Sequence, residues 1–174
     1  MRLAHNINDN IKHPNYNTRQ EVLDCTEPIG FDGIYLNIYE NQDVLVGKSG
    51  IMFPMGNTLG GDNSFDIAHV PQLEKYCTLA QVMELCDKYD FQLGWHTWTH
   101  RHLTKLSDKE VRQEITAPFE TTLFRYPHGV TDARVIQLVK EAGYTHAYCA
   151  GPHGTLDTNV PDQNLQIWSP YLTL

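Results

Sequence analysis

The sequence predicts an α/β protein in which strands and helices alternate along one domain that spans residues 1–174. Two observations support this fold class. Short apolar runs typical of buried strands alternate with segments whose apolar residues recur at helical spacing. Single Gly and Pro residues separate these segments, with no linker or internal repeat. Such alternation favours a mainly parallel sheet, so we expect functional residues at the carboxyl ends of strands.

In the first half of the chain, strands are expected at 28–31 and 51–55, with a helix around 35–46 between them. Thr78 and Gln81 then have the spacing of a capping box, in which each side chain accepts a bond from the backbone N–H of the other residue. A helix is therefore expected to begin after Thr78.

The second half continues the alternation. Ser107 and Glu110 form another predicted capping box and open a short helix. A further helix is expected from about Thr131, and Gly143 stands where a left-handed residue ends a helix. The expected strands of this half are 91–96, 122–125 and 144–149.

Composition narrows the classes of function. The 174 residues include 13 Lys and Arg against 21 Asp and Glu, a formal net charge of -8 without a basic cluster, so no nucleic-acid partner is expected. With no long apolar stretch and no export signal, the chain is expected to be soluble, to lack a transmembrane segment and to be cytoplasmic by default. The four scattered cysteines indicate buried thiols. Nine histidines are the unusual count, because imidazoles bind metals and transfer protons near neutral pH.

Two histidines follow one strand candidate. His96 and His100 are four residues apart, and on a helical turn two such imidazoles can converge on one divalent cation. Taken alone, the pair is a weak indication of a metal site, and exposed histidines or histidines bonded in the core are the alternative.

Two other loops follow strand candidates. In the segment 125–129, Pro127 removes a backbone donor and Gly129 permits positive φ, so the loop can direct a backbone N–H inward; an ordinary turn is the alternative. Asp32 precedes Gly33, and here a plain Asp-Gly turn is the alternative to a catalytic carboxylate.

In this order, the three motifs resemble those of the polysaccharide deacetylases of carbohydrate esterase family four, the NodB-type homology domain. Residues 31–41 are similar to the family's Phe-Asp-Asp-Gly-Tyr-x-Ser-x-Tyr-Glu-Asn, and 102–108 to its continuation after the histidine motif. Residues 3–9 are similar to the opening of a subgroup whose barrel is circularly permuted.

The resemblance implies a distorted (β/α) barrel. The chain is contracted relative to the family between Ile7 and Asp32 and again between Ile115 and Phe124, so the barrel is expected to be incomplete. An incomplete barrel can stay open or pair with a second copy, which makes a homo-oligomer a possible assembly.

The resemblance also implies roles for matching residues. His96 and His100 become ligands of a divalent metal ion, with Zn²⁺ expected, and Asp32 becomes the base for water attack on an acetyl carbonyl. Arg125 is implied to orient that base, and the backbone N–H of His128 to bind the oxyanion. A metal-activated water fits the absence of a Gly-x-Ser-x-Gly elbow.

Three positions qualify this picture. The resemblance implies His5 as the general acid for the leaving amine, whereas the residues alone favour a terminal side chain without a role. Gly33 replaces the second, metal-binding Asp of the family, so Asp32 or Asp62 would have to supply the missing oxygen. His128 stands where the family usually has tyrosine, and its imidazole could be a ligand, a proton donor or a surface group.

The implied function is a metal-dependent hydrolase that removes acetyl groups from an amino-sugar polysaccharide or a related acetylated carbohydrate. The alternative is a degenerate relative that binds carbohydrate with little or no turnover. In either case Trp95, Trp98 and Tyr126 could stack on sugar faces or serve as core or rim residues. An amidase acting on a non-sugar amide is a third, weaker reading.

Overall fold

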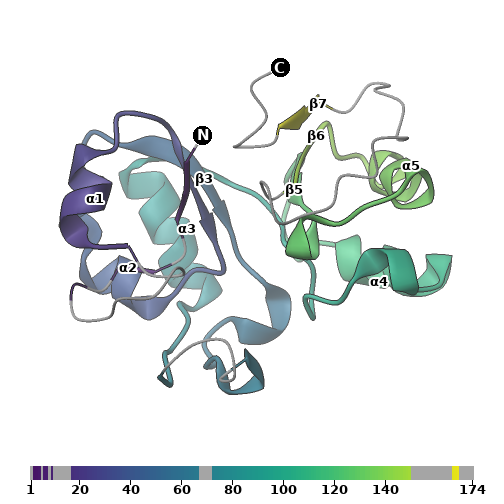
Figure 1. The fold of residues 1–174 in the computed structure, drawn as a ribbon, viewed down its shortest axis with the longest axis horizontal. Helices are drawn as coiled ribbons and strands as arrows, with labels where there is room; N and C mark the ends of the chain where they lie inside the picture. Colours follow the sequence, from purple (N-terminus) through teal and green to yellow (C-terminus); the bar gives the residue numbers. More distant parts are fainter. Residues whose placement is uncertain are drawn as a thin grey trace. The chain divides into compact units, whose positions relative to one another are not determined.

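The computed structural model describes residues 2–4, 6–7, 9, 17–66, 72–149 and 166–168. The chain divides into two compact units, Met1–Leu93 and Gly94–Leu174 (Figure 1). Within each unit the strands pair in parallel, which confirms the α/β class. No closed barrel is formed by the strands of the described residues, and the single domain expected over 1–174 stays a prediction.

The first unit is built on a four-stranded parallel sheet with the order β1-β2-β3-β4. Its strands are β1 (Arg2–Ala4), β2 (Ile29–Asp32), β3 (Ser49–Phe53) and β4 (Asp90–Leu93). Asp32, the last residue of β2, lies opposite Phe53, the last residue of β3. The register therefore places Asp32 at the carboxyl edge of the sheet, as expected for a functional residue.

Helices α1 (Arg19–Asp24), α2 (Leu36–Glu40) and α3 (Leu79–Lys88) belong to the same unit (Figure 1). The predicted capping box of α3 is confirmed, because Thr78 and Gln81 bond each other's backbone N–H groups. The helix expected around 35–46 is interrupted: α2 ends at Glu40, and a 3₁₀ turn, Gln42–Leu45, follows. The strand expected at 51–55 ends at Phe53, since Pro54 has no N–H for a sheet.

The core of the first unit lies between these helices and the sheet. Its fully buried members come from both kinds of element: Phe31, Ile38, Val44, Leu45, Met52, Val82 and Leu85. Alternate residues of the central strands and one face of α3 thus become inaccessible to water, which is the main favourable contribution to folding.

The second unit has a three-stranded parallel sheet with the order β5-β6-β7. Its strands are β5 (Leu123–Arg125), β6 (His146–Tyr148) and β7 (Gln166–Trp168), and its helices are α4 (Asp108–Ile115) and α5 (Ala133–Glu141). The capping box at Ser107 and Glu110 is confirmed. Asp132 caps α5, and Gly143 has φ +94° just after that helix, as predicted.

The strand expected at 91–96 is shorter than predicted, because β4 ends at Leu93. Trp95 instead forms a single parallel bridge with Phe124, in which Trp95 N donates to the Leu123 carbonyl and Arg125 N donates to the Trp95 carbonyl, both at 2.9 Å. This bridge fixes the chain immediately before His96. Within the described part of the chain, no helix is long and apolar enough to cross a membrane.

Candidate functional site

The three predicted site motifs lie in two different units. His96, His100, Arg125 and His128 all belong to the second unit, and Asp32 belongs to the first. His5 lies outside the described residues.

The histidine loop, residues 96–102, begins directly after the Trp95 bridge. It is not the helical turn that the four-residue spacing could have indicated, because residues 96–100 are irregular. Thr97 and His100 have φ of +68° and +57°. Each left-handed residue other than glycine costs about 1–2 kcal/mol, so the surroundings of the loop must hold this conformation.

His96 is almost completely buried, at 1% exposure, and its Nδ1 lies 2.9 Å from the carbonyl oxygen of Arg125. Because a carbonyl oxygen only accepts, Nδ1 carries the hydrogen and the lone pair of the neutral ring lies on Nε2. This arrangement, with one ring nitrogen bonded to a carbonyl, is the usual state of a metal-binding histidine.

The ring of His100 lies beside that of His96. Their centroids are 4.8 Å apart and the planes are inclined by 70°. The backbone N–H of His100 donates to Thr97 Oγ1 at 3.1 Å, which closes the loop between the two rings. The irregular loop thus brings together the same two imidazoles that a helical turn would have brought together.

The proline loop, residues 125–129, supplies the other groups near this pair. Arg125 ends β5 and is only 2% exposed, although it carries a charge. His128 has φ +58° and is followed by Gly129 with φ +67°. Among the described residues, the non-glycine residues with positive φ are Thr97, His100 and His128. In the part of the chain that the structure describes, left-handed non-glycine residues therefore occur only in two of the three loops that carry predicted motifs.

The side chain of His128 is exposed but held in place. Its Nε2 donates to the carbonyl oxygen of His100 at 2.9 Å. Its ring stacks on His102 with a centroid separation of 4.0 Å and an angle of 20°. His128 therefore joins the proline loop to the histidine loop, a contact that the sequence did not reveal.

Two of the three aromatics considered for sugar stacking are core residues. Trp95 and Tyr126 are both 0% exposed and pack with Phe124 in the core of the second unit. Burial also raises the pKa of Tyr126. Trp98 is half-buried, and its Nε1 donates to the Thr116 carbonyl at 2.8 Å. The core interpretation therefore holds for Trp95 and Tyr126.

Sequence reasoning missed Glu114. This carboxylate projects from α4 and is 3% exposed, and it accepts bonds from the backbone N–H groups of Trp98 and Thr99 in the histidine loop. The signal was present, because Glu114 shares the helix face of the apolar Val111 and Ile115. A charged residue on an apolar stripe indicates a buried polar partner.

In the first unit, Asp32 is half-buried at the end of β2 and Gly33 follows with φ +67°. A Cβ at position 33 would lie 3.3 Å from both the Met55 methyl group and the ring of Tyr76. Tyr76 in turn stacks on Tyr35, with centroids 4.2 Å apart. The space beside Gly33 is thus narrow and occupied by apolar groups.

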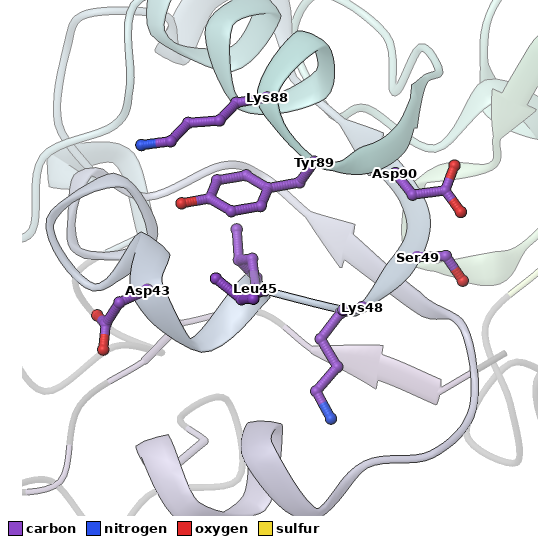
Figure 2. A pocket seen from close by; sticks show the side chains of 9 residues that line it. Asp43, Leu45, Lys48, Ser49, Lys88, Tyr89 and Asp90 are labelled. Carbon is purple, nitrogen blue, oxygen red and sulfur yellow. The ribbon is translucent and has the colours of Figure 1, made fainter.

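A cavity of about 680 Å³ opens elsewhere in the first unit, at the amino ends of β3 and β4. Figure 2 shows Tyr89 and Leu45 among charged side chains that line it. The two lysines already have partners: Lys48 Nζ donates to the carbonyls of Leu23 and Cys25, and Lys88 Nζ donates to the side-chain oxygen of Gln42. The cavity contains none of the predicted site residues.

The cysteines are reduced, as expected. Cys25, Cys77 and Cys149 are buried and Cys86 is half-buried, each as a free thiol. Burial raises the pKa of Cys149 to about 11, although the nearby positive charge of Arg125 opposes the shift. A thiol with so high a pKa is a poor nucleophile at neutral pH, so Cys149 serves as a buried core residue.

A model of the polysaccharide deacetylase family matches residues 52–147, which is more than half of the chain and includes both the histidine loop and the proline loop. The chain belongs to the polysaccharide deacetylase family. Comparison with curated protein sequences finds no match.

Several solved structures share the fold of this chain. IcaB from Ammonifex degensii has a TM-score of 0.64 and 14% identity, over 84% of this chain and 83% of that one. The deacetylase PplD of Streptococcus pyogenes, determined with acetate, has a TM-score of 0.65 and 12% identity, over 85% of this chain and 81% of its own. BC0361, a polysaccharide deacetylase from Bacillus cereus, has a TM-score of 0.64 and 16% identity, over 98% of this chain and 63% of that one.

In this member of the polysaccharide deacetylase family, two imidazoles lie side by side in the histidine loop. The rings of His96 and His100 and the tautomer of His96 suit two imidazole ligands. Among the described residues, however, no three His, Cys, Asp or Glu side chains are grouped closely enough to share an ion. Asp62, considered as a replacement ligand, instead accepts a bond from the backbone N–H of Ser64 at 3.0 Å.

Proposed function

We propose that this chain is a metal-dependent hydrolase that removes acetyl groups from an amino-sugar polysaccharide or a related acetylated carbohydrate. Family membership supports a deacetylase. The structural observation that supports the proposal most is the pair of adjacent imidazoles, His96 and His100, with His96 bonded through Nδ1 to the Arg125 carbonyl. A homo-oligomer remains a prediction.

In this proposal His96 and His100 hold the divalent ion, with Zn²⁺ expected. When bound, such an ion polarises a carbonyl and lowers the pKa of a coordinated water. The bond from His96 Nδ1 to the Arg125 carbonyl keeps Nε2 as the ligating atom and limits rotation of the ring. The proline loop therefore contributes to the orientation of the first ligand.

The remaining roles follow the family resemblance. Asp32 takes a proton from the attacking water, and Arg125 orients this carboxylate by its charge. The backbone N–H of His128 donates to the oxyanion, and His5 returns a proton to the leaving nitrogen. The left-handed conformation of His128 supports the oxyanion role, because it sets the direction of that peptide group.

One observation favours the second candidate, a relative that binds acetylated carbohydrate with little or no turnover. The family's third ligand is absent at Gly33, and the space beside this residue is occupied by Met55 and Tyr76. Two neutral imidazoles without an anionic ligand bind divalent cations more weakly than a three-ligand site. Weak metal binding would leave carbohydrate binding as the main activity.

The experiment measures bound metal in the purified protein and acetate release from acetylated chitooligosaccharides with added Zn²⁺, Co²⁺ or Ni²⁺. His96→Ala should lose both metal and activity. His146→Ala is the matched control, because His146 lies on β6 of the same unit and bonds the Thr145 hydroxyl instead of either loop. If the wild-type protein binds the sugars, binds no metal and releases no acetate, the second candidate is established.

A further inference from the structure

We propose that Glu114 is a positioning residue that fixes the histidine loop and thereby the relative placement of His96 and His100. Its importance for metal binding rests on the proposed function, but its effect on the loop does not. The proposal begins from the burial of a charge. Glu114 is 3% exposed, on the face of α4 that also carries Val111 and Ile115. A buried carboxylate is unfavourable unless hydrogen bonds and opposite charge compensate for its lost hydration.

The histidine loop supplies all the compensation that is observed. Glu114 Oε2 accepts from the backbone N–H groups of Trp98 at 3.0 Å and Thr99 at 2.9 Å. Oε1 accepts a short bond from the Thr99 hydroxyl and lies 3.2 Å from Nη2 of Arg101. Both oxygens of Glu114 are therefore engaged, by donors that lie between the two histidines or just after them.

These bonds act where the loop is strained. Thr97 and His100, with positive φ, flank Trp98 and Thr99, the two residues whose N–H groups meet the carboxylate. In a helix or strand those N–H groups would bond to the backbone, but here the side chain of Glu114 takes that place. An unfavourable conformation persists when surrounding interactions over-determine it.

The same end of α4 also holds the entrance to the loop. The carbonyl of Glu114 accepts a bond from Trp95 Nε1 at 3.0 Å, so the backbone of this residue anchors Trp95 while its side chain anchors Trp98 and Thr99. One residue thus contacts the chain on both sides of His96. Because both carboxylate oxygens already accept bonds, Glu114 is not available as a metal ligand.

The test compares Glu114→Gln with Glu141→Gln. Both replace a carboxylate in the second unit by an amide of equal size, but Glu141 is exposed and pairs with Arg112. In Glu114→Gln the negative charge is lost and one oxygen becomes an NH₂ donor, so the side chain can no longer accept from the backbone N–H groups of Trp98 and Thr99 at one end and from the Thr99 hydroxyl and Arg101 at the other. In metal-free protein, we expect NMR to show large changes at the amides of Trp98 and Thr99 and weaker contacts between the rings of His96 and His100. Glu141→Gln should leave these signals unchanged.

Cobalt binding gives the second measurement. We expect Glu114→Gln to bind Co²⁺ at least tenfold more weakly, with an altered visible spectrum, at temperatures where circular dichroism shows it to be folded. If wild-type protein binds no Co²⁺, the proposed function fails and the NMR comparison still tests Glu114. If folded Glu114→Gln retains the wild-type loop signals, the positioning role is overturned.

A second pair of variants covers the case in which Glu114→Gln does not fold. Thr99 is exposed, so Thr99→Val should fold while losing the hydroxyl bond to Oε1, and Thr99→Ser keeps that bond. We expect Thr99→Val to shift the His96 and His100 ring signals in NMR, and Thr99→Ser to restore them. Identical spectra for the two variants would contradict the proposal.

Discussion

His128 Nε2 donates a hydrogen bond to the carbonyl oxygen of His100 at 2.9 Å. In the opposite direction, the histidine loop donates from His96 Nδ1 to the Arg125 carbonyl of the proline loop. Each loop thus uses an imidazole to hold the backbone of the other. This reciprocal arrangement joins the two loops that carry the predicted histidine and proline motifs.

The first prediction concerns His128. His128→Ala removes the bond to His100 but keeps a side chain at φ +58°, whereas His128→Gly removes the bond and relieves the strain. In both variants the histidine loop should be less well ordered. The Gly variant should have a higher free energy of unfolding than the Ala variant, by about 1 kcal/mol. Urea unfolding measures the difference. Equal stabilities would show that position 128 is not strained in solution.

The second prediction concerns Gly33. Gly33→Ala should lower the free energy of unfolding by about 1–2 kcal/mol, because φ is +67° and the new methyl group would lie close to Met55 and Tyr76. Gly33→Asp should be similarly destabilised, since Asp tolerates this conformation only somewhat better. Titration with Co²⁺ then compares the two variants. If position 33 lacks only a ligand, the Asp variant binds more tightly; equal affinities would reject that explanation.

The third prediction separates the two roles considered for Asp32. If Asp32 is the base, Asp32→Asn should reduce acetate release by about 10²–10⁴-fold and leave the Co²⁺ affinity unchanged. If Asp32 is instead a metal ligand, Asp32→Asn should reduce both acetate release and Co²⁺ affinity. The matched control is Asp90→Asn, at the exposed amino end of β4, which should retain both properties. A drop in Co²⁺ affinity for Asp32→Asn would assign the carboxylate to the metal.

The fourth prediction concerns His5 as general acid. An amine leaving group needs a proton, whereas 4-nitrophenolate leaves without one. His5→Ala should therefore slow acetate release from an acetylated amino sugar much more than hydrolysis of 4-nitrophenyl acetate. The kcat ratio for the two substrates measures the effect. Equal losses on both would remove His5 from the acid role.

The fifth prediction is a loss of stability at high pH. Burial raises the pKa of Cys149 from its ordinary 9.0 to about 11, and that of Cys77 from 9.0 to about 12. A raised pKa means that the folded protein retains protons that the unfolded chain releases, so stability is complete below pH 9 and falls above it. Each thiol contributes a slope of at most about 1.4 kcal/mol per pH unit in this range. Urea unfolding of wild-type and Cys149→Ala between pH 8 and 10.5 should show a smaller slope for the variant.

Local signals in the sequence predicted much of the fold. The two capping boxes, at Thr78 and Ser107, form as expected because their partners are three residues away and need no tertiary contact. The predicted bounds of the strands differ from the observed bounds by one to three residues, because a strand ends where its neighbour stops pairing. The short helix α1 went unpredicted, although Thr18 and Glu21 form a capping box there too.

The candidate site was predictable only in its residue types. Order and spacing of the motifs indicated His96, His100 and Arg125, and the family match agrees with the resemblance on which their roles rest. Contacts between the two loops and the role of Glu114 were not predictable, because their donors and acceptors lie 13 to 29 residues apart along the chain. No periodicity connects such positions.

The sequence by itself determined the α/β class, the starts of α3 and α4 and the candidate residues for the chemistry, because these depend on neighbouring residues and on motif order. Tertiary structure alone decided how the histidine loop is held. A loop with two left-handed residues cannot satisfy its own N–H groups, so a buried carboxylate from α4 and an imidazole from the proline loop complete its hydrogen bonds.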